Sequence, residues 1–195
     1  MKKIVYTLVS LFILVAMFAV IPEFSKDVKG QELFRKWVAS TWEQEENRFS
    51  VTVDKKMRHQ NMGADSNSYD FRLGIVSKNE EKHFSKAHEK QFERFFEYQV
   101  SDGEIKQLQI RGIYFFKDSK RLLLFTRDKA VKNFLLDLNR EDTLRLWLIN
   151  KLDSSRIEIN VPNSTIISWL DLVDYKLTKE ERTKAREKRK RQQRK

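Results

Sequence analysis

The feature that most restricts how this chain can fold is an apolar run near its start, over residues 4–21, which contains no charged side chain. As a helix rising about 1.5 Å per residue, the run nearly crosses a hydrocarbon core about 30 Å thick. Two interpretations compete, a cleaved secretory signal and an uncleaved signal-anchor. The run exits through Ile21, Pro22 and Glu23 rather than through small residues in an A-x-A arrangement. The sequence therefore favours a transmembrane signal-anchor over residues 1–22.

Charges flank this run on both sides, so the excess of cations that usually marks the cytoplasmic side does not decide its orientation. Lys2 and Lys3 precede the run, whereas Lys26 and Lys29 follow it together with acidic neighbours. A short, lysine-rich start is typical of a bacterial inner-membrane protein with its amino terminus inside. The sequence accordingly predicts a single-pass protein of the cell inner membrane, whose folded domain lies outside the cytoplasm.

The composition indicates an ordered chain with room for a single core. Its 195 residues are 40% hydrophobic and 34% charged, and only five glycines and two prolines interrupt them. A chain of this length usually forms one domain with appendages. Cysteine is absent, which excludes disulfides, thiolate catalysis and zinc-thiolate sites.

Most of the positive charge is concentrated at the C terminus. Residues 179–195 contain ten Lys and Arg against three Glu, a net +7 out of the formal +11 of the whole chain. The basic character therefore belongs to the tail and not to a generally cationic domain. Such a block of cations is suited to contact with an anionic polymer or surface. The cations assigned to this contact are Lys184, Arg186, Lys188, Arg189, Lys190, Arg191, Arg194 and Lys195.

The first half of the folded region mixes helical and strand patterns. Apolar residues recur at three- and four-residue spacing over residues 31–48, which predicts an amphipathic helix connecting the anchor to the domain. Alternation predicts strands over residues 49–53 and 71–75. A stripe of Phe and His residues then predicts a helix over residues 80–99, introduced by a capping box that starts at Ser77.

The second half is more regular. Residues 105–116 and 121–125 read as two strands that are joined by the short turn KDSK, which predicts a hairpin. Apolar residues at helical spacing predict a short helix that starts near Asp128. Residues 144–149 and 157–161 alternate again and predict a second hairpin.

The C-terminal part of the chain is less clear. The stretch TIISWLDLVDY, residues 165–175, is almost continuously apolar, and we interpret it as a strand passing into a helix. Thr178 then stands three residues before Glu181, and no helix breaker follows. This spacing predicts a capped, solvent-exposed helix that carries the basic tail.

These elements predict an α+β fold. It consists of an N-terminal transmembrane helix, then a small antiparallel sheet or OB-like barrel with two or three helices, and a basic helical C-terminal tail. The predicted segments are a signal-anchor at 1–22, a connecting amphipathic helix at 23–48, an α+β domain at 49–177 and the basic tail at 178–195.

No residue pattern predicts catalysis, a metal or a cofactor. His83 and His88 would lie about 140° apart around a helix, so they would not converge on one ion, and His59 lies in or beside a loop. The paired glutamates fall on predicted helix surfaces beside Lys or Arg, and the glycine-rich phosphate-binding motifs are absent. We therefore expect no catalytic residue, no metal ligand and no cofactor.

Aromatic residues on the predicted hairpins give a second candidate surface. Alternation places Tyr114 and Phe116 on one face of their strand, and Trp147 lies on the following hairpin. Exposed aromatics on an OB-like sheet stack on bases or sugars, which would make these three residues a binding face. The alternative is that a predicted helix covers them.

Together these features favour a membrane-anchored binding or assembly module without catalysis, whose basic tail contacts an anionic lipid, a wall polymer or an acidic protein. A first alternative is a membrane-tethered RNA- or ribosome-binding protein, which requires a cytoplasmic tail. A second alternative is an enzyme with an unrecognised site. Topology separates the first two, and a cleft with converging polar groups would support the third.

Overall fold

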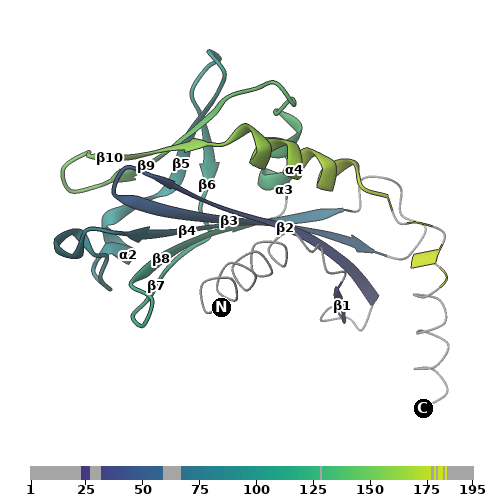
Figure 1. Ribbon diagram of the computed structural model, residues 1–195, viewed down its shortest axis with the longest axis horizontal. Helices are drawn as coiled ribbons and strands as arrows, with labels where there is room; N and C mark the ends of the chain where they lie inside the picture. Colours follow the sequence, from purple (N-terminus) through teal and green to yellow (C-terminus); the bar gives the residue numbers. More distant parts are fainter. Residues whose placement is uncertain are drawn as a thin grey trace, which may run out of the picture.

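A computed structural model shows a protein built from two antiparallel β-sheets and a few short helices (Figure 1). The structure describes residues 23–26, 32–58, 67–127 and 129–176, together with residues 178, 180, 181 and 183. All structural statements below refer to these residues.

The larger sheet has six strands in the order β1-β2-β3-β4-β8-β7. Every neighbouring pair is antiparallel, and the longest ladder joins β2 to β3 through a tight turn at Glu45, whose φ of 53° lies in the left-handed region. The strands are β1 (Glu23–Lys26), β2 (Glu32–Gln44), β3 (Asn47–Arg58), β4 (Ser68–Ser77), β8 (Arg121–Arg127) and β7 (Gly112–Phe116).

The smaller sheet has four strands in the order β10-β9-β5-β6, again all antiparallel. The chain passes from this sheet to the larger one at residues 110–111. The Ile110 amide donates to the carbonyl oxygen of Arg94 in β5, and the Arg111 amide donates to the carbonyl oxygen of Phe125 in β8. The strands are β10 (Arg156–Val161), β9 (Leu144–Asn150), β5 (Phe92–Val100) and β6 (Lys106–Gln109).

The two longer helices lie on the same side of the six-stranded sheet as the smaller sheet, and we call this side the inner face (Figure 1). Helix α3 buries Val131, Phe134 and Leu135, and α4 buries Ile166 and Trp169 among others. The helical segments are η2 (Glu80–Lys82), α2 (His88–Gln91), α3 (Lys129–Leu136) and α4 (Asn163–Asp174).

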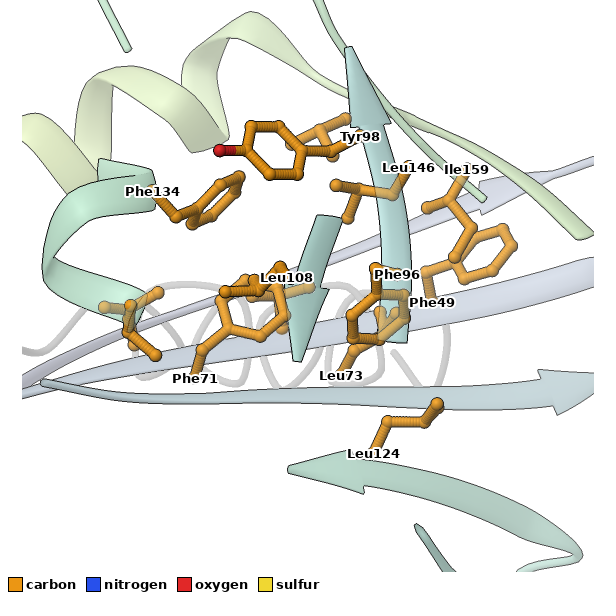
Figure 2. Close-up of a cluster of buried hydrophobic side chains, with 14 of the residues drawn as sticks. Phe49, Phe71, Leu73, Phe96, Tyr98, Leu108, Leu124, Phe134, Leu146 and Ile159 are labelled. Carbon is orange, nitrogen blue, oxygen red and sulfur yellow. The ribbon is translucent and has the colours of Figure 1, made fainter. Parts of the chain in front are cut away.

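The core lies between the two sheets and these helices, and its centre is an aromatic cluster (Figure 2). Phe71 of β4 contacts Phe96 of β5, Phe134 of α3 and Trp169 of α4, with ring centroids 6.3, 5.8 and 5.7 Å away. All three contacts are edge-to-face, the arrangement that aromatic rings prefer. One side chain of the larger sheet therefore joins both sheets and both helices.

Several predictions of local structure are confirmed. The strands expected at residues 49–53 and 71–75 lie within β3 and β4, and the hairpins expected on either side of α3 are β7–β8 and β9–β10. The single strand expected over residues 105–116 is wrong, because this stretch is divided between β6 of the smaller sheet and β7 of the larger one. The short helix is α3, with its predicted apolar stripe buried. The ambiguous stretch after Pro162 is helix α4 and contains no strand.

The predicted fold class is wrong, because neither of two segments expected to be long helices is one. Most of residues 31–48 belongs to β2 and the start of β3, and residues 80–99 contain the short turns η2 and α2 followed by β5. Phe92 and Phe96 lie four residues apart, a spacing that shares a face in a strand as well as in a helix. Strand pairing with β3, β9 and β6 decided the outcome. The strands form two sheets and not an OB-like barrel.

The predicted membrane helix needs a separate correction. Among the described residues, no helix is both long and apolar enough to cross a membrane. The signal-anchor was expected at residues 1–22, which lie outside the described residues. The described helices therefore do not support the prediction of a single-pass inner-membrane protein.

The aromatic cluster makes a first testable prediction. Phe71→Ala removes a fully buried ring that four elements share, so we expect it to lower the free energy of unfolding by about 3–5 kcal/mol. Leu152→Ala, at a side chain 74% exposed, is the control and should change it by less than about 0.5 kcal/mol. Equilibrium urea unfolding measures both, and equal effects would mean that this cluster does not dominate the core.

Candidate binding surfaces

The structure separates the predicted aromatic residues. Tyr114 and Phe116 lie on β7 with exposed fractions of 52% and 47%, on the face of the six-stranded sheet opposite to α3 and α4, which we call the outer face. Trp147 lies on β9 of the other sheet. The three residues therefore do not form one surface.

Trp147 is held by neighbours on its own sheet. Its indole nitrogen donates to Glu158 of β10 at 3.1 Å, and the Arg145 guanidinium lies 5.8 Å from its ring. Only 8% of the residue is exposed. In this position the ring stabilises the β9–β10 pair and presents little surface to a ligand.

The Tyr114–Phe116 surface is completed by residues that the sequence reading did not single out. The outer end of the Tyr114 ring lies against Gly112, where an added Cβ would come within 2.6 Å of the ring. The Arg121 side chain lies across Gly74, and its guanidinium carbon is 5.7 Å from the Phe116 ring centroid. Strand alternation could have found Arg121, because it shares a parity with outward-facing Phe125 and Arg127.

A row of charges crosses the same outer face further along the sheet. Asp54 of β3 and Asp70 of β4 are direct cross-strand partners and are 3% and 4% exposed. Arg35 and Arg72 lie 3.1 and 3.0 Å from Asp54, and Lys56 lies 2.5 Å from Asp70. Two buried like charges side by side destabilise a sheet unless cations compensate them, and three cations do so here.

The inner face holds one buried cation. Lys55 is 2% exposed, and its ammonium donates to the carbonyl oxygens of Val173 and Tyr175, the latter at 2.8 Å. These carbonyls lie at the C-terminal end of α4, where the helix dipole favours a positive charge. Burial nevertheless lowers the pKa of Lys55 to about 8, while Asp174 acts in the opposite direction.

The start of the basic tail is attached to this same corner. The Lys36 ammonium lies 3.0 Å from the centroid of the Tyr175 ring, and the Tyr175 hydroxyl donates to Glu181. The predicted capping box is confirmed: the Thr178 amide donates to the Glu181 carboxylate at 2.8 Å, and the Glu181 amide donates to the Thr178 hydroxyl at 3.2 Å. The tail therefore leaves the domain from a defined position beside β2. The eight predicted binding cations, residues 184–195, lie outside the described residues.

One cavity, of about 520 Å³, lies between β6 and α3, a size within the range of small-molecule sites. Its polar wall is already paired internally, because Asp137 accepts from Tyr98 at 3.1 Å and from Lys106 at 2.9 Å. Burial and the Asp137 carboxylate raise the pKa of Tyr98 to about 12. The cavity offers a ligand no unpaired charge among these three groups.

The described histidines have local partners. The Ser85 amide donates to His88 Nδ1 at 2.9 Å, and His83 Nδ1 lies 3.0 Å from the Lys120 ammonium. Within the described ranges, no group of three His, Asp or Glu side chains is placed to hold a metal ion. His59 lies outside those ranges.

Comparison with known proteins adds no assignment. No family model matches the chain, and searches of curated proteins and of solved structures find no match. The function must therefore be argued from the chain's own residues.

Lys55 makes a second prediction. In the unfolded chain its pKa is near 10.5, so between pH 8 and 10.5 the unfolded state binds more protons than the folded state, and stability rises with pH through this window. Relative to Lys55→Met, which has no such group, the wild type should gain about 2–3 kcal/mol between pH 7 and pH 10.

Urea unfolding of both proteins at several pH values measures this difference, because the other titrating groups are common to the two proteins. The control is Lys129→Met, at an exposed lysine of α3. A constant difference between wild type and Lys55→Met across the window would show that Lys55 titrates as an ordinary exposed lysine.

Proposed function

We propose that this protein is a non-enzymatic binding module whose basic C-terminal tail contacts an anionic polymer or surface. The observation that carries the proposal is the concentration of charge, since residues 179–195 supply +7 of the formal net +11. Every cation near an anionic lipid surface adds about 1 kcal/mol, and each phosphate neutralised on a nucleic acid releases counterions. A tail with this density of cations gains from both effects.

The attachment of the tail supports this proposal. The Lys36–Tyr175 contact and the hydrogen bonds between Tyr175, Thr178 and Glu181 hold the first residues of the tail segment against the domain. The eight cations then follow in sequence from a fixed point on the domain. This arrangement suits a module that links its folded part to a charged partner.

The described groups with the largest pKa shifts also favour binding over catalysis. Lys55 binds the carbonyls that end α4, Tyr98 donates to Asp137, and Tyr175 donates to Glu181. In each case burial is the largest cause of the pKa shift, and the group already has a hydrogen-bond partner among the described residues. An enzyme would place such groups around an open cleft with an unpaired acid or base.

The proposed partners are anionic lipid, an acidic wall polymer or an acidic protein, and the second candidate is RNA. The outer-face aromatics Tyr114 and Phe116 favour this second candidate, because exposed rings beside cations are typical of single-strand binding. A membrane anchor is not part of either proposal.

The tail makes the third prediction. Replacing the eight cations of residues 184–195 by Gln should lower affinity for a polyanion at least tenfold and flatten its dependence on salt. A shuffled tail of unchanged composition is the matched control and should bind like the wild type, because the interaction is set by charge and not by order. Fluorescence anisotropy with labelled polyphosphate, and sedimentation with vesicles containing phosphatidylserine, measure the two classes of partner.

The two readouts distinguish the outcomes. Loss of binding to both probes in the Gln variant, with an unchanged melting temperature, supports the proposal. Undiminished binding in the Gln variant would assign any polyanion contact to the folded domain and overturn the role of the tail.

A further inference from the structure

The outer face of the six-stranded sheet carries a second site, separate from the tail. We propose that the surface formed by Tyr114, Phe116, Arg121 and Phe125, here called the β7–β8 platform, binds single-stranded nucleic acid by stacking on its bases. The site lies wholly in the described domain, so it can fail while the proposed role of the tail stands, and the reverse.

The Tyr114 ring lies against the backbone of its own strand. The ring's Cε2, Cζ and hydroxyl oxygen all lie 2.6–2.8 Å from where a Cβ on Gly112 would be. Only glycine leaves room for the ring there, and the ring is thus supported by the backbone while 52% of the residue remains exposed. A ring supported in this way loses little conformational freedom when a base stacks on it.

The Arg121 side chain also lies on this face of the sheet. Ser50 Oγ, Arg121 Nε and Arg121 Cδ lie 2.5, 3.0 and 3.2 Å from where a Cβ on Gly74 would be, so two side chains of the outer face cover this glycine. Arg121 Nε is buried and makes no hydrogen bond within the described residues. The guanidinium lies beside the ring of Phe116, which is itself 47% exposed.

Cations lie beside the rings of this face. Along the outer face of β8, Arg121 and Arg127 flank Leu123 and Phe125, and the Arg127 guanidinium lies 6.0 Å from the Phe125 ring. The Arg121 guanidinium lies beside Phe116 in the same way. The platform therefore offers two rings with a cation next to each, which matches bases joined by phosphates.

The spacing of the two exposed rings fits this occupant. Tyr114 and Phe116 are two residues apart on one strand, which separates their Cα atoms by about 6.8 Å. The Tyr114 ring lies over Gly112, further from Phe116 than its own Cα, so the two rings are spaced for bases of an extended strand and not for bases stacked at about 3.4 Å. A lipid surface needs the cations but not this spacing, and Trp147, on the other sheet, takes no part.

The experiment uses the full chain and two labelled probes of equal charge, a twelve-nucleotide oligothymidylate and an abasic twelve-mer with the same phosphates. The test variant is Tyr114→Ala with Phe116→Ala. The matched control is Ile105→Ala with Leu152→Ala, which removes two apolar side chains of equal or greater exposure elsewhere. Fluorescence anisotropy gives the affinities, and melting temperature reports folding.

We expect the test variant to lose about 10- to 100-fold in affinity for oligothymidylate and less than twofold in affinity for the abasic probe. Tyr114→Phe, which keeps the ring, should bind like the wild type, and Arg121→Gln should weaken the oligothymidylate more than the abasic probe. The control variant should bind like the wild type. Neutralising the tail should lower the affinity for both probes equally, and this result distinguishes the role of the tail from that of the platform.

Three results would overturn the proposal: no binding of oligothymidylate by the wild type at low salt, equal wild-type affinity for the two probes, or an unaffected test variant. In competition experiments, vesicles or an acidic polysaccharide are added at the same concentration of negative charge as the oligothymidylate. If either displaces the oligothymidylate, the platform binds that ligand instead. If the test variant does not fold, photocrosslinking of wild type to a 5-iodouracil oligomer decides. Crosslinks within residues 112–125 support the platform, and crosslinks in the tail alone refute it.

Discussion

The structure depends on one contact between its layers, the packing of Phe71 against Phe96, Phe134 and Trp169. The four rings come from β4, β5, α3 and α4, so the two sheets and the two longer helices share one cluster, of which Figure 2 labels Phe71, Phe96 and Phe134. Because the helices and the smaller sheet all cover the inner face, the described elements leave the outer face of the six-stranded sheet for other contacts. The β7–β8 platform is exposed because the described elements cover the core from the other face.

The alternation of side chains along each strand then determines which charged groups are buried. Each buried charge needs a partner that compensates its lost hydration. In β3 the sequence VDKK places Val53 and Lys55 inward and Asp54 outward. Lys55 is tolerated because two carbonyls at the end of α4 receive its ammonium, and Asp54 because Arg35 and Arg72 compensate it. The same corner that accommodates Lys55 also holds the start of the tail, so the cost of burying this cation is tied to the position of the C-terminal segment.

Local patterns predicted the elements whose apolar residues follow one clear period, and failed for β2 and β5, although both pair with the next strand in the sequence. The hairpins β7–β8 and β9–β10 and the stripe of α3 could be read directly. In β2, however, Trp37 faces outward while Val38 and Trp42 face inward, and a strand apolar on both faces imitates helical spacing. Of the candidate sites, Tyr114 and Phe116 were identifiable by alternation, whereas the roles of Gly112 and Gly74 depend on side chains from the same face and required the structure.

The tail and the platform lie at opposite sides of one sheet, and their separation bears on how they act together. The tail leaves beside β2, four strands from β7 or about 19 Å across the sheet, and it starts on the inner face whereas the platform lies on the outer face. A segment of the tail's length reaches about 25 Å as a helix and roughly 23 Å as a random coil, so a bound polyanion that passes the edge of the sheet has to span part of the separation. One extended polyanion can therefore engage both sites, and the second contact forms at an effective concentration in the millimolar range. Two weak sites, one selective for charge and one for bases, would then discriminate single-stranded nucleic acid from other polyanions better than either alone.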